Sequence, residues 1–383
     1  TLKYVIVTVP VGLALSTFLA ALLNAKIKGK SIYRTLYFLP SVTMSAAVAM
    51  VWKWIYNEQM GILNSAIKAM GGTGHNWLTD SKTALFMIMI VGLWMTVGYN
   101  MIILLAGMQG INSVYYEAAA IDGASEITQF FKITVPMLTP TVFFVMITSI
   151  ISGFQVFDTV YMMIGKASPA FEATQTVVAL FYRTAFDYGY KGYAAAISIL
   201  IFAAIMIVTV RDRNAAVRDH HVYHAAADDR TEEMGELRLR RSENMKGKFK
   251  LNHLIVHLIL LVGVIVVVFP FAWMILTSFK TSGEAMKIPP TIFPEKFVTT
   301  AYHTIVTSAI PFATVYMNTI ITTVVTTLVQ IVFCSMAGYA FGRIEFPFKN
   351  AIFILVLSVL MVPGQIFLLP QYQIVQKLGL LDT

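Results

Sequence analysis

Eight long apolar runs dominate this sequence and constrain its fold more than any other feature. They cover roughly residues 4–24, 32–55, 83–107, 137–164, 192–210, 252–277, 312–340 and 350–370. About 20 apolar residues cross a bilayer as an α-helix, and a helix satisfies its own backbone hydrogen bonds in lipid. The sequence therefore predicts an all-α polytopic membrane protein with about eight transmembrane helices.

The scarcity of charge agrees with a chain surrounded by membrane lipid. Charged residues make up 13% of the 383 residues, against about a quarter in soluble domains. The net charge is +8, but Lys and Arg cluster beside the apolar runs, which indicates membrane orientation and not a nucleic-acid partner. The single cysteine, Cys334, allows no intramolecular disulfide and no paired-cysteine metal site.

The basic residues also predict which loops face the cytoplasm. Segments 25–34, 108–136, 211–250 and 341–349 hold most of the Lys and Arg residues. Positively charged loops stay on the cytoplasmic side. We therefore expect these four segments to face the cytoplasm.

Residues 211–250 differ from the rest because they are dense in charge of both signs. Such a segment cannot bury enough apolar surface to fold alone, so it predicts a disordered or weakly helical linker. It divides the chain into a first membrane region (1–210), a linker (211–244) and a second region (245–383), with a weak repeat between 21–40 and 337–363. The abrupt change in composition favours a misjoined or frame-shifted junction over a natural fusion, a choice that the nucleotide sequence decides.

One predicted cytoplasmic loop carries an unusual pattern. It reads Glu117-Ala118-Ala119, then Asp122-Gly123-Ala124, and ends at Pro136. The alanines favour a helix, Gly123 allows a sharp turn, and a proline marks a boundary. The pattern predicts a short helix, a turn and a second short helix. Such a segment either docks on a partner protein or lies as an amphipathic connector at the membrane surface.

This loop resembles the EAA loop of permease subunits in bacterial ATP-binding-cassette importers, with Val135 where a leucine is usual. The stretches RTLYFLP (34–40), WKWIYN (52–57) and NMIILLAGMQGI (100–111) are similar to the carbohydrate-uptake subgroup of the maltose and glycerol-phosphate type. GKASP (165–169) departs from that subgroup's T-x-G-G-P element. Residues 245–383 resemble the partner permease, from FPFAWMILTSFKT (269–281) to AGYAFGRIEFPFKN (337–350). The resemblance implies that five helices of one permease precede three of another and that both permeases are incomplete.

The resemblance implies a permease that moves a sugar or related polyol across the bacterial cytoplasmic membrane. It implies that the loop couples transport to a cytoplasmic ABC ATPase dimer through Glu117, Ala118, Ala119, Asp122, Gly123, Ala124 and Pro136. A second permease and an extracytoplasmic solute-binding protein are the other expected partners. The chain has no GxxxxGK[ST] phosphate loop. We therefore expect ATP hydrolysis on a separate subunit, no directly bound cofactor and no enzymatic activity.

Polar and aromatic residues within the runs are candidates for a substrate pathway, because such residues are costly in a membrane. They are Trp94, Tyr99, Asn100, Gln155, Asp158 and Tyr161. Aromatic faces beside amides and hydroxyls suit sugars. The alternative is that the aromatic residues form an interfacial belt and the amides bond neighbouring helices. His220, His221 and His224 lack the further ligands of a closed site, so no metal is predicted.

Two other functional classes remain as alternatives. An ion-coupled secondary carrier needs carboxylates near helix centres and no docking loop, and the sequence shows the reverse. A structural membrane protein without a transport role would not co-purify with a cytosolic ATPase.

Overall fold

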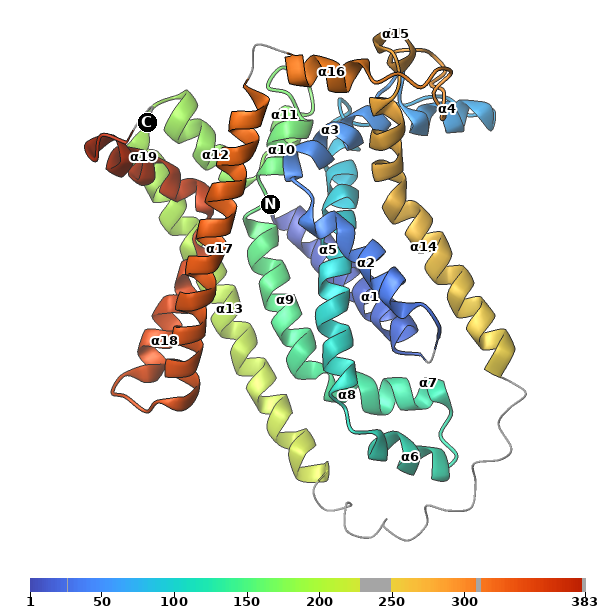
Figure 1. Ribbon diagram of the computed structural model, residues 1–383. Coiled ribbons are helices and arrows are strands. Elements are labelled where there is room, and N and C mark those ends of the chain that lie inside the picture. Colours follow the sequence, from blue (N-terminus) through green and yellow to red (C-terminus); the bar gives the residue numbers. More distant parts are fainter. Residues whose placement is uncertain (26, 228–248, 308–310, 381–383) are drawn as a thin grey trace. The chain divides into compact units, whose positions relative to one another are not determined.

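The fold was analysed in a computed structural model, which describes residues 1–25, 27–227, 249–307 and 311–380 (Figure 1). The described residues form helices and no strands. The principal helices are α1 (Leu2–Asn24), α2 (Lys30–Phe38), α3 (Ser45–Ile55), α4 (Ile62–Ala69), α5 (Ala84–Gln109), α6 (Ser113–Ile121), α7 (Glu126–Gln129), α8 (Val135–Met137), α9 (Thr139–Phe154), α10 (Asp158–Met163), α11 (Phe171–Thr174), α12 (Val177–Tyr182), α13 (Lys191–Ala227), α14 (Phe249–Ser278), α15 (Ser282–Ala285), α16 (Thr300–Thr307), α17 (Phe312–Arg343), α18 (Lys349–Ser358) and α19 (Leu368–Lys377).

The predicted number of membrane spans is confirmed. Five helices are each long and apolar enough to cross a bilayer: α1, α5, the part of α13 up to Thr209, the part of α14 from Leu254, and α17. Three pairs of helices joined at a bend raise the number to eight if each pair is one span. The eight overlap the eight apolar runs of the sequence, but the pair Glu126–Met137 and Thr139–Phe154 begins before the run 137–164.

The three bent spans differ from the continuous helices that apolar content alone predicts. The run 32–55 turns by 96° between residues 42 and 45, and the run 350–370 turns by 91° near Pro363. A bend of 65° precedes α9, and α9 ends at Phe154, so the run 137–164 is also divided. Prolines at 40, 136, 140 and 363 lie at these breaks, where the missing N–H interrupts the helix.

The chain forms two compact units. One comprises Thr1–Glu58, His75–Pro270 and Pro363–Thr383, and the other comprises Gln59–Gly74 and Phe271–Val362. The backbone of α13 continues to Ala227, so the beginning of the expected linker is helical. Residues 228–248 of that linker lie outside the described residues. The division of the sequence at 210 and 245 stays a prediction.

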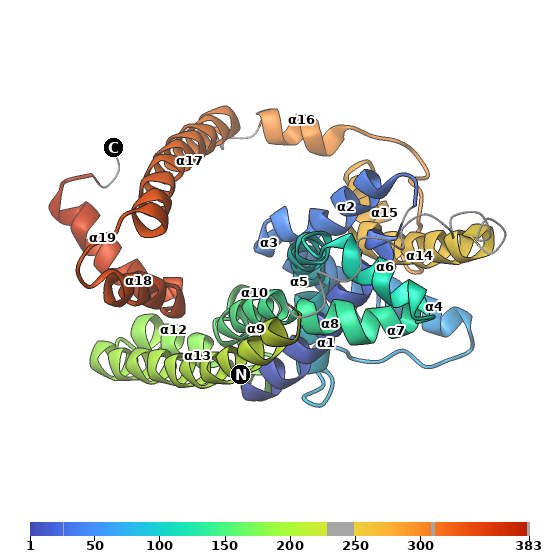
Figure 2. The same ribbon diagram turned by 90° about the horizontal axis from the view of Figure 1, so that it is seen from below.

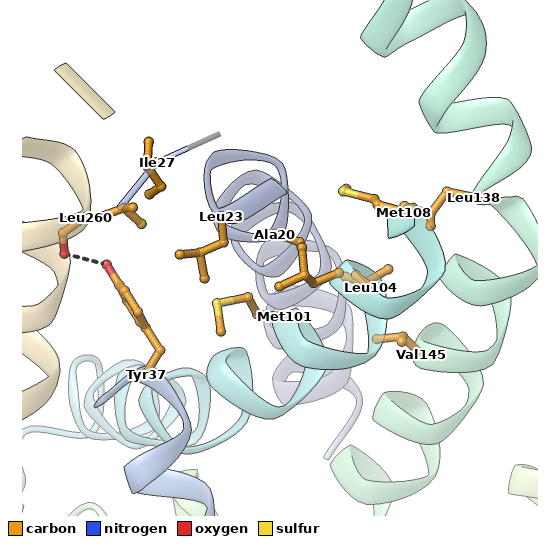
Figure 3. Packing of buried hydrophobic residues seen from close by; sticks show 11 residues of the cluster. Ala20, Leu23, Ile27, Tyr37, Met101, Leu104, Met108, Leu138, Val145 and Leu260 are labelled. Carbon is orange, nitrogen blue, oxygen red and sulfur yellow. Dashed lines mark hydrogen bonds between the residues drawn. The ribbon is translucent and has the colours of Figure 1, made fainter. Parts of the chain in front are cut away.

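The core of the first unit forms where α1, α5 and α9 lie side by side (Figures 1 and 2). Ala20 and Leu23 of α1 meet Met101 and Leu104 of α5, and Val145 of α9 closes the cluster (Figure 3).

The N-terminal half of α14 joins this core through apolar contacts and two hydrogen bonds to α2, one of them between Tyr33 and His257. The Tyr37 hydroxyl donates to the carbonyl oxygen of Leu260, 3.0 Å away (Figure 3). The same contact requires Gly263, because a Cβ there would lie 2.0 Å from the Tyr37 hydroxyl oxygen. The core therefore fixes α5, the helix from which both candidate sites extend.

Candidate functional site: an exposed helical loop and a membrane cavity

The first site is the segment 113–137, which we call the helical loop. It follows α5, and α6 and α7 lie at the end of the first unit opposite α10 and α12 (Figure 1). Its first helix begins at Asn112, whose side chain accepts a hydrogen bond of 3.1 Å from the Val114 N–H. This cap satisfies one of the N–H groups left unpaired at a helix start. The Asn112 cap therefore fixes where the helical loop begins.

The turn between the two helices has the geometry that Gly123 was predicted to supply. Gly123 adopts φ +79°, a left-handed conformation in which a side chain is strained. The N–H groups of Gly123 and Ala124 donate to the carbonyls of Ala120 and Ala119, at 3.2 and 2.9 Å, which is the Schellman closure of a helix. Ser125 then caps α7 by accepting from the Thr128 N–H at 3.2 Å. The predicted helix, turn and helix are confirmed.

The far end of the helical loop is fastened to the membrane core. The hydroxyls of Tyr116 and Thr134 lie 2.9 Å apart and join α6 to the π-helical turn Phe130–Thr134. Phe130 packs on the core cluster to which the buried Leu138 belongs. Pro136 lies within α8, immediately before the 65° bend into α9. The loop therefore has an attached base and a projecting turn.

The projecting turn exposes an apolar surface beside acidic side chains. Ile121, Ile127 and Phe131 are 52%, 72% and 64% exposed. Glu117 and Asp122 are also exposed, whereas Ala118, Ala119 and Ala124 are half-buried. Exposed apolar side chains on a short projecting segment favour a surface that binds a protein. Sequence reasoning emphasised the alanines and did not identify Ile121 and Ile127, because their exposure depends on the direction of the turn.

The second site is a cavity of about 290 Å³ between α1, α5 and α9. Its lining residues are uncharged: Tyr4, Thr8, Val9, Gly12, Ser41, Gly92, Met95, Thr96, Tyr99, Asn100, Thr148, Ser149, Ser152 and Gly153. The cavity is therefore polar through hydroxyl and amide groups alone.

The hydroxyl groups of this lining are oriented by their own helices. Thr8, Thr96 and Thr148 donate to backbone carbonyls four residues earlier, at 2.7, 2.9 and 2.9 Å. The Asn100 amide donates to the Ser149 hydroxyl oxygen at 3.1 Å and joins α5 to α9. A hydroxyl whose proton is engaged in this way keeps only acceptor capacity. The three threonines of the cavity wall therefore present acceptors to a bound molecule.

The six residues predicted for a substrate pathway separate into different surroundings. Tyr99 and Asn100 line the cavity. Trp94 is buried, and its ring lies edge-on to that of Trp52, with 5.7 Å between centroids. Tyr161 stacks on Phe157 at 5.1 Å.

Gln155 follows the last residue of α9, and Asp158 is exposed at the start of α10. A substrate role for the six stays a prediction. Sequence reasoning missed Thr96 and Ser149. Their signal is a stripe of small and polar residues four apart, Gly92, Thr96 and Asn100, which faces Ser149 and Ser152.

The described residues contain no cluster of His, Cys, Asp and Glu that fits a metal ion. The side chains of His220, His221 and His224 lie outside the described residues.

Spanning helices around an uncharged cavity, together with a projecting loop, agree with a membrane transport permease. Residues 12–215 match the family described as binding-protein-dependent transport system inner membrane component. The match covers more than half of the chain, and the chain belongs to this family.

Individual relatives agree with the family. The probable ABC transporter permease protein YesP of Bacillus subtilis is 34% identical over 212 residues, which cover 55% of this chain and 68% of that protein. The lactose transport system permease protein LacF of Rhizobium radiobacter is 35% identical over 214 residues, which cover 55% and 71%. The trehalose/maltose transport system permease protein MalF of Thermococcus litoralis is 32% identical over 210 residues, which cover 55% and 70%.

The fold also has a solved counterpart. A bacterial ABC transporter that imports the acidic polysaccharide alginate matches 56% of this chain and 77% of its own, with a TM-score of 0.52 and 19% identity. At this identity the likeness shows the fold alone.

Family membership makes the chain a multi-pass inner-membrane transport component and not an enzyme. The resemblance predicted from residues 117–136 is confirmed at the level of the family. The ion-coupled carrier and the structural membrane protein are set aside.

Proposed function

We propose that the chain is a permease of an ATP-driven importer for an uncharged sugar or related polyol. An extracytoplasmic solute-binding protein would deliver the substrate, and a second permease subunit would complete the pathway. A cytoplasmic ABC ATPase dimer would bind and hydrolyse ATP, so that this chain binds no cofactor itself. The orientation predicted from the basic loops supports this arrangement, because it places the helical loop on the cytoplasmic side.

The observation that carries the proposal is the geometry of the helical loop. Its exposed apolar turn offers a docking surface to the ATPase, and its base is joined to the core through Phe130 and Leu138. Ala118 and Ala119 would allow close approach of the partner, and the exposed Glu117 and Asp122 would make polar contacts. Closure of the ATPase dimer would then displace α9 relative to α5, the two helices that share the cavity.

The uncharged cavity supports the choice of substrate. Relatives are named for lactose and for trehalose and maltose, all uncharged sugars, whereas another is named for sn-glycerol-3-phosphate. Bringing an isolated phosphate or carboxylate into a site without an opposite charge is costly. Among these substrates the lining of Thr, Ser, Asn and Tyr side chains therefore favours the uncharged sugars.

Replacement of Gly123 tests the coupling. In proteoliposomes that contain both permeases, the ATPases and the binding protein, Gly123→Val is expected to reduce uptake of labelled sugar about tenfold, since left-handed backbone costs a side-chain-bearing residue about 1–2 kcal/mol. ATP hydrolysis should no longer respond to the loaded binding protein.

Gly165→Val is the matched control, because Gly165 lies in a loop where an added Cβ meets nothing within 4 Å and φ is not positive. This variant should keep both activities. Equal uptake by Gly123→Val and the wild type would refute the coupling role of the helical loop.

A further inference from the structure

A buried aromatic cluster lies beside the cavity helices. Trp52 and Tyr56 are one turn apart at the end of α3, with ring centroids separated by 5.2 Å. Trp94 of α5, which directly precedes the cavity residue Met95, lies 5.7 Å from Trp52. Helix α3 also packs on α10. The cluster is therefore enclosed by α3, α5 and α10.

Two hydrogen-bond donors in this cluster are not explained by packing. The Trp52 Nε1 and the Tyr56 hydroxyl oxygen are buried, and neither has a partner among the residues that the structure describes. The whole side chains are also buried, at 9% and 4% exposure. A buried donor without an acceptor destabilises a fold, whereas phenylalanine would fill much the same space without that cost. The two polar atoms call for a partner in some other state of the protein.

The attachment of α3 provides such a state. The helix has only 11 residues and follows a 96° bend. At the bend Thr43 is extended, with φ −88° and ψ 141°, so the helical conformation is interrupted there. Large dihedral changes at a few residues between elements are how helices move as hinged bodies. Rotation at residues 42–44 would separate α3 from α5 and α10 and uncover both donors.

The chemistry of the two donors complements that of the cavity. The threonine hydroxyls of the cavity wall present acceptors, whereas Trp52 presents an N–H and Tyr56 an O–H beside aromatic faces. A sugar hydroxyl is both a donor and an acceptor, and sugar C–H groups pack on aromatic rings. We propose that Trp52 and Tyr56 form a second sugar-contact site, in which both donate hydrogen bonds to sugar oxygens when α3 swings away. This proposal rests on the proposed function.

The test compares stability with transport in the reconstituted importer. Trp52→Phe and Tyr56→Phe remove one donor each and keep an aromatic ring. Uptake of whichever of lactose, maltose or trehalose the wild type imports should fall roughly two- to tenfold at subsaturating sugar, the loss expected for one hydrogen bond. The midpoint of thermal unfolding in detergent should stay equal or rise, because an unpaired buried donor has been removed. Trp54→Phe, two residues away, is the matched control and should leave uptake unchanged.

Monodeoxy analogues of the same sugar give a readout that a packing role would not move. The wild type should take up one of these analogues more slowly than the parent sugar. The variant that lacks the matching donor should take up that analogue and the parent sugar at equal rates. A lower unfolding midpoint with unchanged uptake in both variants would overturn the site and assign the donors to packing. An equal loss in Trp54→Phe would overturn it as well. Failure of the wild type to import any of the three sugars would instead count against the proposed function, and the site would fall with it.

Discussion

Helices α5 and α17 are equally apolar on average, yet they are packed in opposite ways. In α5, 56% of the apolar window is buried, whereas no residue of the α17 window is buried among those that the structure describes. Mean hydropathy thus sets whether a segment can enter a bilayer and does not set what it packs against.

Glycine environments account for much of this difference. A Cβ on Gly92 or Gly98 of α5 would lie 2.0 Å or less from Tyr4 or Tyr37, so neighbouring elements approach the α5 backbone directly. Gly338 and Gly342 of α17 have no atom within 4 Å of such a Cβ. Close approach at small residues is how membrane helices gain packing energy, since lipid is as apolar as their side chains.

The largest expected effect is at Gly98. An added Cβ would lie 1.8 Å from the carbonyl oxygen of Tyr37, a backbone atom that cannot rotate away. Gly98→Ala should lower the free energy of unfolding by about 3 kcal/mol or more, as measured by denaturant titration in detergent. Gly338→Ala should change it by no more than about 0.5 kcal/mol. Equal effects of the two substitutions would abolish the contrast between α5 and α17.

A smaller effect is expected where α14 meets Tyr37. Tyr37→Phe should cost about 1 kcal/mol, since it removes the bond to the Leu260 carbonyl. Gly263→Ala should cost about 1–3 kcal/mol in the wild type and less beside Tyr37→Phe, because the hydroxyl oxygen that its Cβ meets is gone. A double-mutant cycle on unfolding free energies measures this coupling. Strict additivity would show that α14 does not pack on Tyr37.

The bond between Asn100 and Ser149 predicts a still smaller effect. Ser149→Ala removes the acceptor that joins α5 to α9, and such bonds between membrane helices contribute about 0.6 kcal/mol. Thr319→Ala on α17 is the counterpart, because its hydroxyl donates to the Val315 carbonyl of the same helix. Denaturant titration should show a loss for Ser149→Ala alone. A larger loss for Thr319→Ala would reverse the comparison.

The smallest effect concerns an ordered loop in the second unit. A Glu284 carboxylate oxygen accepts hydrogen bonds from the Glu295 N–H at 2.8 Å and the Thr291 hydroxyl at 2.9 Å. The backbone N–H of Glu295 is the main cause that lowers the pKa of Glu284 below its usual 4.5. The ionised Glu284 carboxylate therefore stabilises the loop fully above about pH 4.5. This stabilisation is lost as the pH falls through the lowered pKa. Hydrogen exchange at the Glu295 amide should reveal this opening on acidification.

Glu284→Gln is the control for this loop, because it cannot titrate. The ratio of exchange rates between the variant and the wild type should therefore approach one at low pH. A ratio independent of pH would contradict the assignment. Together with the comparisons of α5 and α17 variants, this result would show whether the loop at Glu284 contributes more to the stability of the second unit than α17 does.

Sequence alone predicts those features that depend on local chemistry. Twenty apolar residues identify a span wherever it packs, and Gly123 beside Asp122 identifies a turn before any partner is known. The prolines at 40 and 363 predict a helix end or a kink in these runs, but they do not predict bends as sharp as those at residues 42–45 and near Pro363. A proline in a membrane helix is compatible with either a kink or a full stop, and tertiary contacts decide between them.

The cavity shows what the sequence alone does not predict. Tyr99 and Asn100 were identified because they are conspicuous in an apolar run, whereas Thr96 and Ser149 were not. Hydroxyl residues bond to their own helix, so their sequence does not reveal which neighbour they face. The inward direction of Phe130 beside the outward Phe131 likewise depends on the π-helical turn at Phe130–Thr134, which no composition indicates.

The two hydrogen-bonded ends of the helical loop have a mechanical consequence. The Schellman closure at Gly123 and the Tyr116–Thr134 bond make α6 and the following turn a short, stiff strut. A force applied at the tip of the helical loop would therefore be transmitted to Pro136, because the strut does not bend. The direction of α9 would then change with the position of the tip. The angle of the turn at Gly123 would set how far α9 rotates for a given displacement of the tip.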